Sequence, residues 1–173
     1  MLTLSRQGAK LKTSVNKPDT SRPLNATAWQ QLEQYYTELV TQITIPEDPE
    51  PNDIKYVVSA IDSVYAEARL DLAKARRGHD RIERKYKLAS KEAYLAVKDA
   101  GKTEKDKEAL AVAYIRSTKL DADPMPVTDM LDIAEERYLF MQAVVDVLND
   151  KSNKCIIENG LLKIDVSLGG QGA

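Results

Sequence analysis

The stretch IKYVVSAIDSVYAEARLDLAKARRGHDRIERKYKLASKEAYLAVKDA, residues 54–100, decides the fold. Apolar or small residues recur every seven positions in two rows, which is typical of a coiled-coil seam. We therefore expect one long helix that packs on other helices, because an isolated helix gains little stability by itself. The rows are Ile54, Ile61, Ala68, Ala75, Ile82, Ala89 and Ala96, and Val58, Tyr65, Leu72, His79, Tyr86, Ala93 and Ala100.

Gly78 and His79 are the weak point of this helix. A Gly inside a helix costs about 1 kcal/mol relative to Ala, and His79 occupies a seam position. One interpretation is a slightly bent helix with a solvated imidazole, and the other is a pH switch or a metal ligand. With a single His and a single Cys, a metal site depends on carboxylates or on a second subunit. We therefore expect no metal and no cofactor.

Shorter helices flank the long one. Asn25 is a suitable N-cap for a helix that ends near Ile43, and a Pro-rich acidic linker follows over residues 46–51. Thr103 is a suitable cap for a short helix from Glu104 to Arg116. A fourth helix starts at Thr128 and ends at Asn159–Gly160. Its apolar stripe is Val127, Leu131, Ala134, Tyr138, Met141, Val145, Leu148, Ser152 and Cys155.

The two ends of the chain differ from this helical middle. Residues 1–23 contain Gly, Pro and basic residues with few apolar ones, which predicts an extended basic arm. In residues 161–173, Leu162, Ile164 and Val166 alternate with polar residues, which predicts a strand-like tail. We therefore expect an all-α fold, an elongated antiparallel hairpin or bundle over residues 24–160, with an arm and a tail.

Charge is strongly segregated, although the net charge is only −2. Residues 74–91 hold eight Lys/Arg against two acids, a net charge of +6, whereas residues 121–150 hold eight acids against Arg137, a net charge of −7. The basic stretch either pairs with the acidic fourth helix or binds nucleic-acid phosphates, with tyrosines 86, 94 and 114 stacking on bases in the second case.

Several functions are not indicated. The chain has no Gly-rich phosphate loop, HExxH pair, CxxC pair or Gly-x-Ser-x-Gly elbow, and Gly101-Lys102-Thr103 lacks the earlier Gly of a Walker motif. We therefore expect no catalytic residues and no enzyme activity. No apolar run approaches the roughly 18 residues of a membrane span, and the N-terminus lacks the apolar core of a signal peptide. The single Cys155 indicates a reducing cytosol.

The run AYLAVKDAGKTEKDKEALAVAY (residues 93–114) lies between EARLDLAKAR (67–76) and AEERYLFMQAVVDVL (134–148). Over residues 55–160 this order resembles small helical proteins of tailed phages, among them the UvsY-like recombination mediators. The shared features are a long helix, a GKTE-type break, a short Ala-rich helix and an E-x-x-Y pattern, here Glu135 and Tyr138.

The resemblance implies an oligomer that binds single-stranded DNA and helps to load a recombinase in the host cytoplasm. Trp29, Tyr36, Leu162, Ile164 and Val166 are the candidate interface residues. The alternative is a virion or assembly protein whose arm and tail latch onto neighbouring subunits and other phage proteins. The candidate DNA-contacting residues are Lys74, Arg76, Arg77, Arg81, Arg84 and Lys85.

Overall fold

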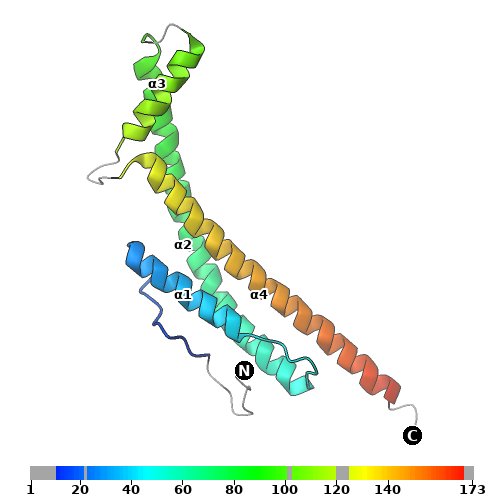
Figure 1. The fold of residues 1–173 in the computed structure, drawn as a ribbon. Coiled ribbons are helices and arrows are strands. Elements are labelled where there is room, and N and C mark those ends of the chain that lie inside the picture. Colours follow the sequence, from blue (N-terminus) through cyan, green and yellow to red (C-terminus); the bar gives the residue numbers. More distant parts are fainter. Residues whose placement is uncertain (1–10, 22, 101–102, 120–124, 170–173) are drawn as a thin grey trace. The chain divides into compact units, whose positions relative to one another are not determined.

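The computed structural model contains four α-helices: α1 (Ala26–Gln42), α2 (Pro51–Val97), α3 (Glu104–Ser117) and α4 (Val127–Gly169) (Figure 1). It describes residues 11–21, 23–100, 103–119 and 125–169, and the side chains of these except 164–169. Within this part there is no β-strand, and one isolated antiparallel bridge joins Lys119 to Pro126. The predicted all-α class is confirmed.

The chain divides into two compact units. Unit 1 comprises residues 1–71 and 141–173, and unit 2 comprises residues 72–140. The helices α2 and α4 each contribute one part to unit 1 and one part to unit 2. Residues 11–21, here called the arm, contain no helix or strand and belong to unit 1. The start of the GKTE-type break, residues 101–102, and residues 1–10 and 22 of the predicted arm lie outside the described residues.

The core of unit 1 is built from one apolar face of each of α1, α2 and α4. The buried residues Leu32, Tyr36 and Leu39 of α1 follow steps of four and three, and Asn25 caps the helix by accepting a hydrogen bond from the Ala28 N–H at 2.8 Å. At the other end of α1, the Lys151 ammonium donates to the Ile43 carbonyl, where a cation is favoured by the helix dipole. The buried residues are Leu32, Tyr36, Leu39 and Ile43, Ile54, Val57, Ile61, Val64 and Ala68, and Met141, Val144, Val145, Leu148 and Cys155.

The buried face of α2 follows the predicted seam only in part. In unit 1 the second row is one residue earlier than predicted, because Val57, Val64 and Asp71 are buried while Val58, Tyr65 and Leu72 are half-buried. From residue 75 onward both predicted rows are at least half-buried as far as Ala93. Two consecutive four-residue steps, 71 to 75 to 79, produce this shift in register, which locally unwinds a heptad pattern. Ala96 and Ala100 are exposed, and Val97 is buried instead.

Unit 2 packs α3 on the C-terminal half of α2 and the start of α4. Thr103 caps α3 as predicted, in a capping box with Asp106. The core cluster consists of small or medium residues, Ala89, Ala93, Ile115 and Val127, with Tyr86 and Ala111 packed against it. The alanines allow the helix backbones to approach closely, which fits the Ala-rich second half of the seam.

The C-terminal part of the chain corrects a prediction. The helix α4 continues through Asn159–Gly160 to Gly169, so Leu162, Ile164 and Val166 lie in a helix and not in a strand-like tail. A lone strand leaves its backbone N–H and C=O groups without partners, whereas a helix satisfies them within the segment. The side chains of Ile164 and Val166 lie outside the described part, and Leu162 is half-buried.

The substitution Gly160→Ala distinguishes these two conformations. In the structure Gly160 lies inside α4, and a Cβ added there meets no atom within 4 Å. We expect the alanine to stabilise the protein by about 0.5–1 kcal/mol in urea unfolding followed by circular dichroism. The predicted helix stop would instead place Gly160 in a left-handed cap, where alanine destabilises the protein.

Candidate nucleic-acid interface

The residues predicted to contact DNA all lie on the unit 2 part of α2. Five of the six, namely Lys74, Arg76, Arg77, Arg81 and Arg84, are exposed, and Lys85 is half-buried. Lys87 and Lys91 continue the basic stretch and are also exposed. The structure therefore presents most of this positive charge to solvent.

Five of these cations form a single line along α2, which we call the basic stripe: Lys74, Arg77, Arg81, Arg84 and Lys91. Residues three or four positions apart lie on the same face of a helix. At about 100° per residue, this face is opposite the at least half-buried residues 75, 79, 82, 86, 89 and 93. The basic stripe is therefore on the outer side of the helix.

Contacts with α4 are made by the opposite side of α2. The His79 and Tyr138 rings stack with 5.8 Å between their centroids and 26° between their planes. Further along α2, Ala89 and Ala93 share a cluster with Val127 at the start of α4. The contacts of α2 therefore run from residue 79 to residue 93 while those of α4 run back from 138 to 127, so within unit 2 the two helices are antiparallel, as predicted. Because the basic stripe is on the other side of α2, it points away from α4.

The arginines of the basic stretch do not pair with those acidic residues of α4 whose side chains are described. In the described part of the chain, no carboxylate forms an ion pair with Arg76, Arg77, Arg81 or Arg84. The Arg77 and Arg84 Nε atoms donate instead to carbonyls one turn earlier in α2, at 3.2 and 3.1 Å. The interpretation that the fourth helix neutralises the basic stretch is wrong for these four residues.

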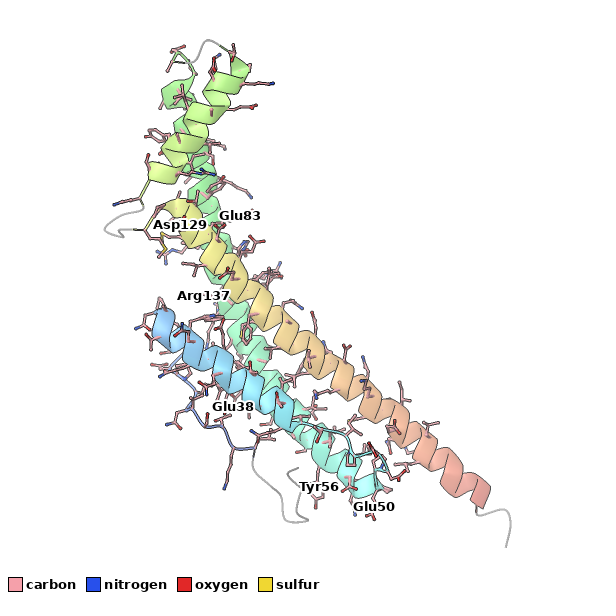
Figure 2. The ribbon with its side chains drawn as sticks, in the orientation of Figure 1. Glu38, Glu50, Tyr56, Glu83, Asp129 and Arg137 are labelled. Carbon is pink, nitrogen blue, oxygen red and sulfur yellow. The ribbon has the colours of Figure 1, made fainter. Side chains whose placement is uncertain are left out.

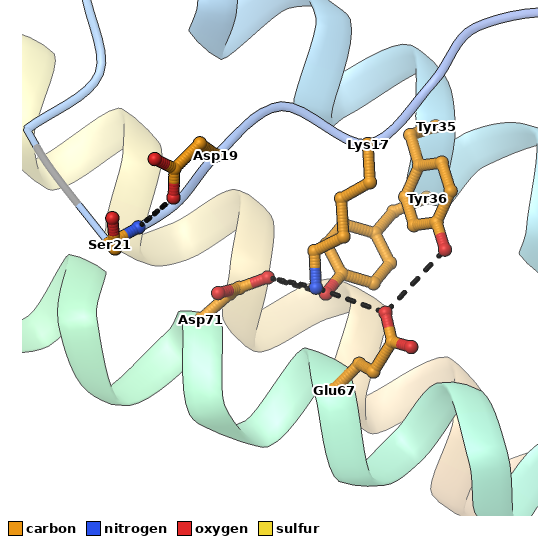
Figure 3. A network of polar contacts seen from close by, with 7 residues as sticks. All are labelled: Lys17, Asp19, Ser21, Tyr35, Tyr36, Glu67 and Asp71. Atoms are coloured by element: carbon orange, nitrogen blue, oxygen red, sulfur yellow. Dashed lines mark hydrogen bonds and ion pairs between the residues drawn. The ribbon is translucent and has the colours of Figure 1, made fainter.

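A second group of charges, in unit 1, joins the arm to α1 and α2 (Figure 3). The Lys17 Nζ lies 2.8 Å from Asp71 Oδ2 and 3.0 Å from Glu67 Oε2. The Tyr36 hydroxyl donates to the same Asp71 oxygen at 2.7 Å, and the Tyr35 hydroxyl lies 3.5 Å from Glu67 Oε2. Asp71 is only 4% exposed, so this carboxylate depends on the partners that Lys17 and Tyr36 provide.

The pKa shifts in this group favour the charged form of Lys17 and the neutral form of Tyr36, which are the forms that donate hydrogen bonds to Asp71. Burial alone lowers the pKa of Lys17, but the hydrogen bonds and charges of Asp71 and Glu67 outweigh it, so the pKa is raised. Burial first, and then the hydrogen bond to Asp71, raise the pKa of Tyr36. Lys17 therefore stays charged and Tyr36 neutral near pH 7, and neither group is prepared for proton transfer there. The arrangement is an anchor for the arm.

Two further contacts hold the arm along α1. The Lys12 N–H donates to Gln42 Oε1 at 3.2 Å, and the Gln42 side-chain amide donates back to the Lys12 carbonyl. The N–H and hydroxyl of Ser14 both donate to Glu38, which Figure 2 labels on α1. These hydrogen bonds lower the pKa of Glu38. The sequence predicted an arm but gave no signal for its binding site on α1.

Trp29 and Tyr36, two of the predicted interface residues, have different environments. Tyr36 is fully buried within unit 1, so it is a core residue and not a contact for a partner. Trp29 is half-buried, and its Nε1–H donates to Glu33 at 2.6 Å. Cys155 is buried, and burial raises the pKa of its thiol, as expected for a small apolar core residue.

Among the described residues, no three His, Cys, Asp or Glu side chains are grouped to hold a metal ion. None of the helices, over the residues that are described, combines the length and apolar character needed to cross a membrane.

Comparison with known proteins gives no further assignment. The chain has no significant match among protein-family models, curated proteins or solved structures. The resemblance to UvsY-like mediators therefore stays a prediction.

The arm anchor makes the protein sensitive to alkaline pH. Lys17, with a raised pKa, stabilises the fold fully below its unfolded pKa of about 10.4, and this contribution is lost as the pH rises through the folded value. Tyr36 acts in the same direction, because unfolded Tyr ionises near pH 10, at about its reference pKa, while buried Tyr36 resists ionisation. We expect the free energy of unfolding to fall above about pH 10, and Lys17→Met/Tyr36→Phe to remove most of this dependence.

At pH 7 the same anchor is tested by a double-mutant cycle. We expect Lys17→Met to cost about 1.5–3 kcal/mol, because Asp71 stays buried with one charged partner fewer. In the Asp71→Asn background the same change costs much less. Lys12→Met is the control, since Lys12 contacts α1 through its backbone. Equal urea midpoints for Lys17→Met and the control contradict the anchor.

Proposed function

We propose that the protein is a non-enzymatic oligomeric module, an elongated antiparallel helical hairpin, that binds single-stranded nucleic acid along the basic stripe. The observation that carries this proposal is the line of exposed cations on α2, whose arginines are paired with no carboxylate in the described part of the chain. Binding of such a line to phosphates releases condensed counterions, which favours association without reading base sequence.

Exposed aromatic side chains elsewhere in unit 2 support single strands over duplexes. Tyr94 on α2 is 53% exposed and Tyr114 on α3 is 43% exposed, so both present ring surface to solvent. Unstacked bases gain energy by stacking on such rings. Tyr86, the third predicted stacking residue, packs against the unit 2 core and is not available.

The biological role that we propose follows the resemblance described above. It is an accessory role in phage recombination, in which the module holds single-stranded DNA and a recombinase in the host cytoplasm. The alternative is a virion or assembly protein that works through its arm and tail. The described part of the arm is held by Lys17 and Ser14 on its own chain, and the tail residues 161–169 continue α4, which favours the first role.

The test is a titration of a labelled 30-residue oligothymidine with the protein between 50 and 200 mM salt, followed by fluorescence anisotropy. We expect Arg77→Gln/Arg81→Gln/Arg84→Gln to weaken binding at least tenfold and to reduce the salt slope by about 2, since each single-strand phosphate contact contributes roughly 0.7. Gln has nearly the helix propensity of Arg, so α2 is preserved.

A matched control removes three exposed positive charges elsewhere in unit 2: Lys98→Gln/Lys105→Gln/Arg116→Gln. We expect this variant to retain most of the affinity. An equal loss in both variants would show attraction to net charge without a defined face. No binding of the unsubstituted protein at 50 mM salt would refute the proposal and leave the assembly role.

A further inference from the structure

The outer side of α4 in unit 2 carries a second charged line. Asp129, Asp132 and Glu136, here called the acidic stripe, follow steps of three and four and are exposed, and the exposed Leu139 follows three residues later on the same face. They lie on the helix face opposite Val127, Leu131, Ala134 and Tyr138, which are buried or half-buried. Figure 2 labels Asp129 near the start of α4.

The two stripes cannot meet within one molecule. In unit 2, α2 and α4 contact each other through His79 and Tyr138, which belong to their inner faces. The basic stripe and the acidic stripe are on the outer faces, and these point in opposite directions. In the described chain no ion pair involves Asp132 or Glu136, and Asp129 accepts a hydrogen bond from the neighbouring Thr128 hydroxyl at 3.0 Å.

The spacing of the stripes matches when a second copy supplies one of them. Laid antiparallel, the steps from Arg77 to Arg81 to Arg84 correspond to those from Glu136 to Asp132 to Asp129. Three ion pairs form in this register: Arg77 with Glu136, Arg81 with Asp132, and Arg84 with Asp129. Apolar side chains lie at each end of the paired segment, since Leu88 is 60% and Leu139 is 54% exposed.

We propose that copies of this protein associate through unit 2, with the acidic stripe of one copy on the basic stripe of the next. Because each copy presents the two stripes on opposite sides, two copies joined by one contact still have one free basic stripe and one free acidic stripe. Such a heterologous interface produces a closed ring or an open filament, not an isolated two-fold dimer. The alternating antiparallel order of α2 and α4 then continues from one copy to the next.

This association uses the same arginines as the proposed binding of nucleic acid. A polyanion and the acidic stripe of a neighbour therefore compete for the basic stripe, so an oligonucleotide is expected to shorten the assemblies. Association of copies needs both the basic and the acidic stripe, whereas nucleic-acid binding needs only the basic stripe. Variants of α4 consequently separate the two proposals.

The test uses two charge-reversal variants of the full chain. One replaces Arg77, Arg81 and Arg84 with Glu, and the other replaces Asp129, Asp132 and Glu136 with Lys. Sedimentation velocity at 50 mM salt is expected to show concentration-dependent assemblies of the unsubstituted protein and monomers of each variant alone. An equimolar mixture of the two variants should assemble again, because each then offers the stripe that the other has lost.

Controls exclude misfolding and net charge as causes. Circular dichroism should show unchanged helix content in both variants, and recovery in the mixture itself requires folded chains. Lys98→Glu/Lys105→Glu/Arg116→Glu lowers the net charge by the same amount as the arginine variant, but outside the stripes, and should assemble normally. Oligothymidine binding should be lost in the arginine variant and retained in the Asp/Glu variant, even if no association occurs.

Three outcomes would overturn the proposal. The first is an unsubstituted protein that stays monomeric up to about 1 mM at low salt, the range in which even weak complexes form. The second is association that survives either reversal, which assigns the interface to another surface. The third is a mixture of variants that remains monomeric. Weakening of the assemblies by salt is expected, because exposed ion pairs are screened.

Discussion

The burial of Asp71 is the constraint on which the arrangement of unit 1 depends. A carboxylate removed from water is stable only when its charge and its hydrogen-bonding capacity are satisfied. Lys17 from the arm and Tyr36 from α1 meet this requirement, so three segments far apart in the sequence are held at one point. Because Asp71 faces inward, Val57 and Val64 also face inward, and this fixes which side of α2 forms the core.

In unit 2 the same helix packs by a different means. Here the buried face of α2 is lined by alanines that admit close neighbours, and Ile115 and Val127 fill the space. Two four-residue steps between Asp71 and His79 change the register from one pattern to the other. The outer face of this part of α2 takes no share in the core, and it is therefore open to carry the basic stripe.

The functional proposals follow from where the charges point. A basic and an acidic helix in one chain invite the interpretation that they neutralise each other, and the near-zero net charge agrees with it. The helices instead meet through His79 and Tyr138, with their charged faces turned outward. This leaves a cationic surface suited to a polyanion and an anionic surface of matching spacing, so the proposed polynucleotide binding and the proposed self-association would use the same arginines.

The sequence by itself predicted the four helices of the described residues, their N-terminal boundaries to within three residues, and three of their four C-terminal boundaries to within a few residues. These features are local: caps such as Asn25 and Thr103 satisfy free N–H groups within one turn, and prolines are disfavoured in the interior of a helix. The apolar stripe of α4 was also predicted, because its alternating steps of four and three residues are typical of a helix. The excess of Lys and Arg over residues 74–91 is also visible in the sequence, whereas contact of the six basic candidates with nucleic acid stays a prediction.

Only the tertiary structure decided the register of α2, the end of α4 and the direction of the charged faces. The heptad rows placed Leu72 in the core of α2 and Asp71 outside it. A buried carboxylate is expected only beside partners, and the partners of Asp71, Lys17 and Tyr36, are distant in the sequence. The alternation at Leu162, Ile164 and Val166 suits a strand, but a strand needs a neighbour for its hydrogen bonds, and α4 provides them within itself. Whether two charged helices pair depends on which faces meet, and packing between residues far apart in the chain determines that.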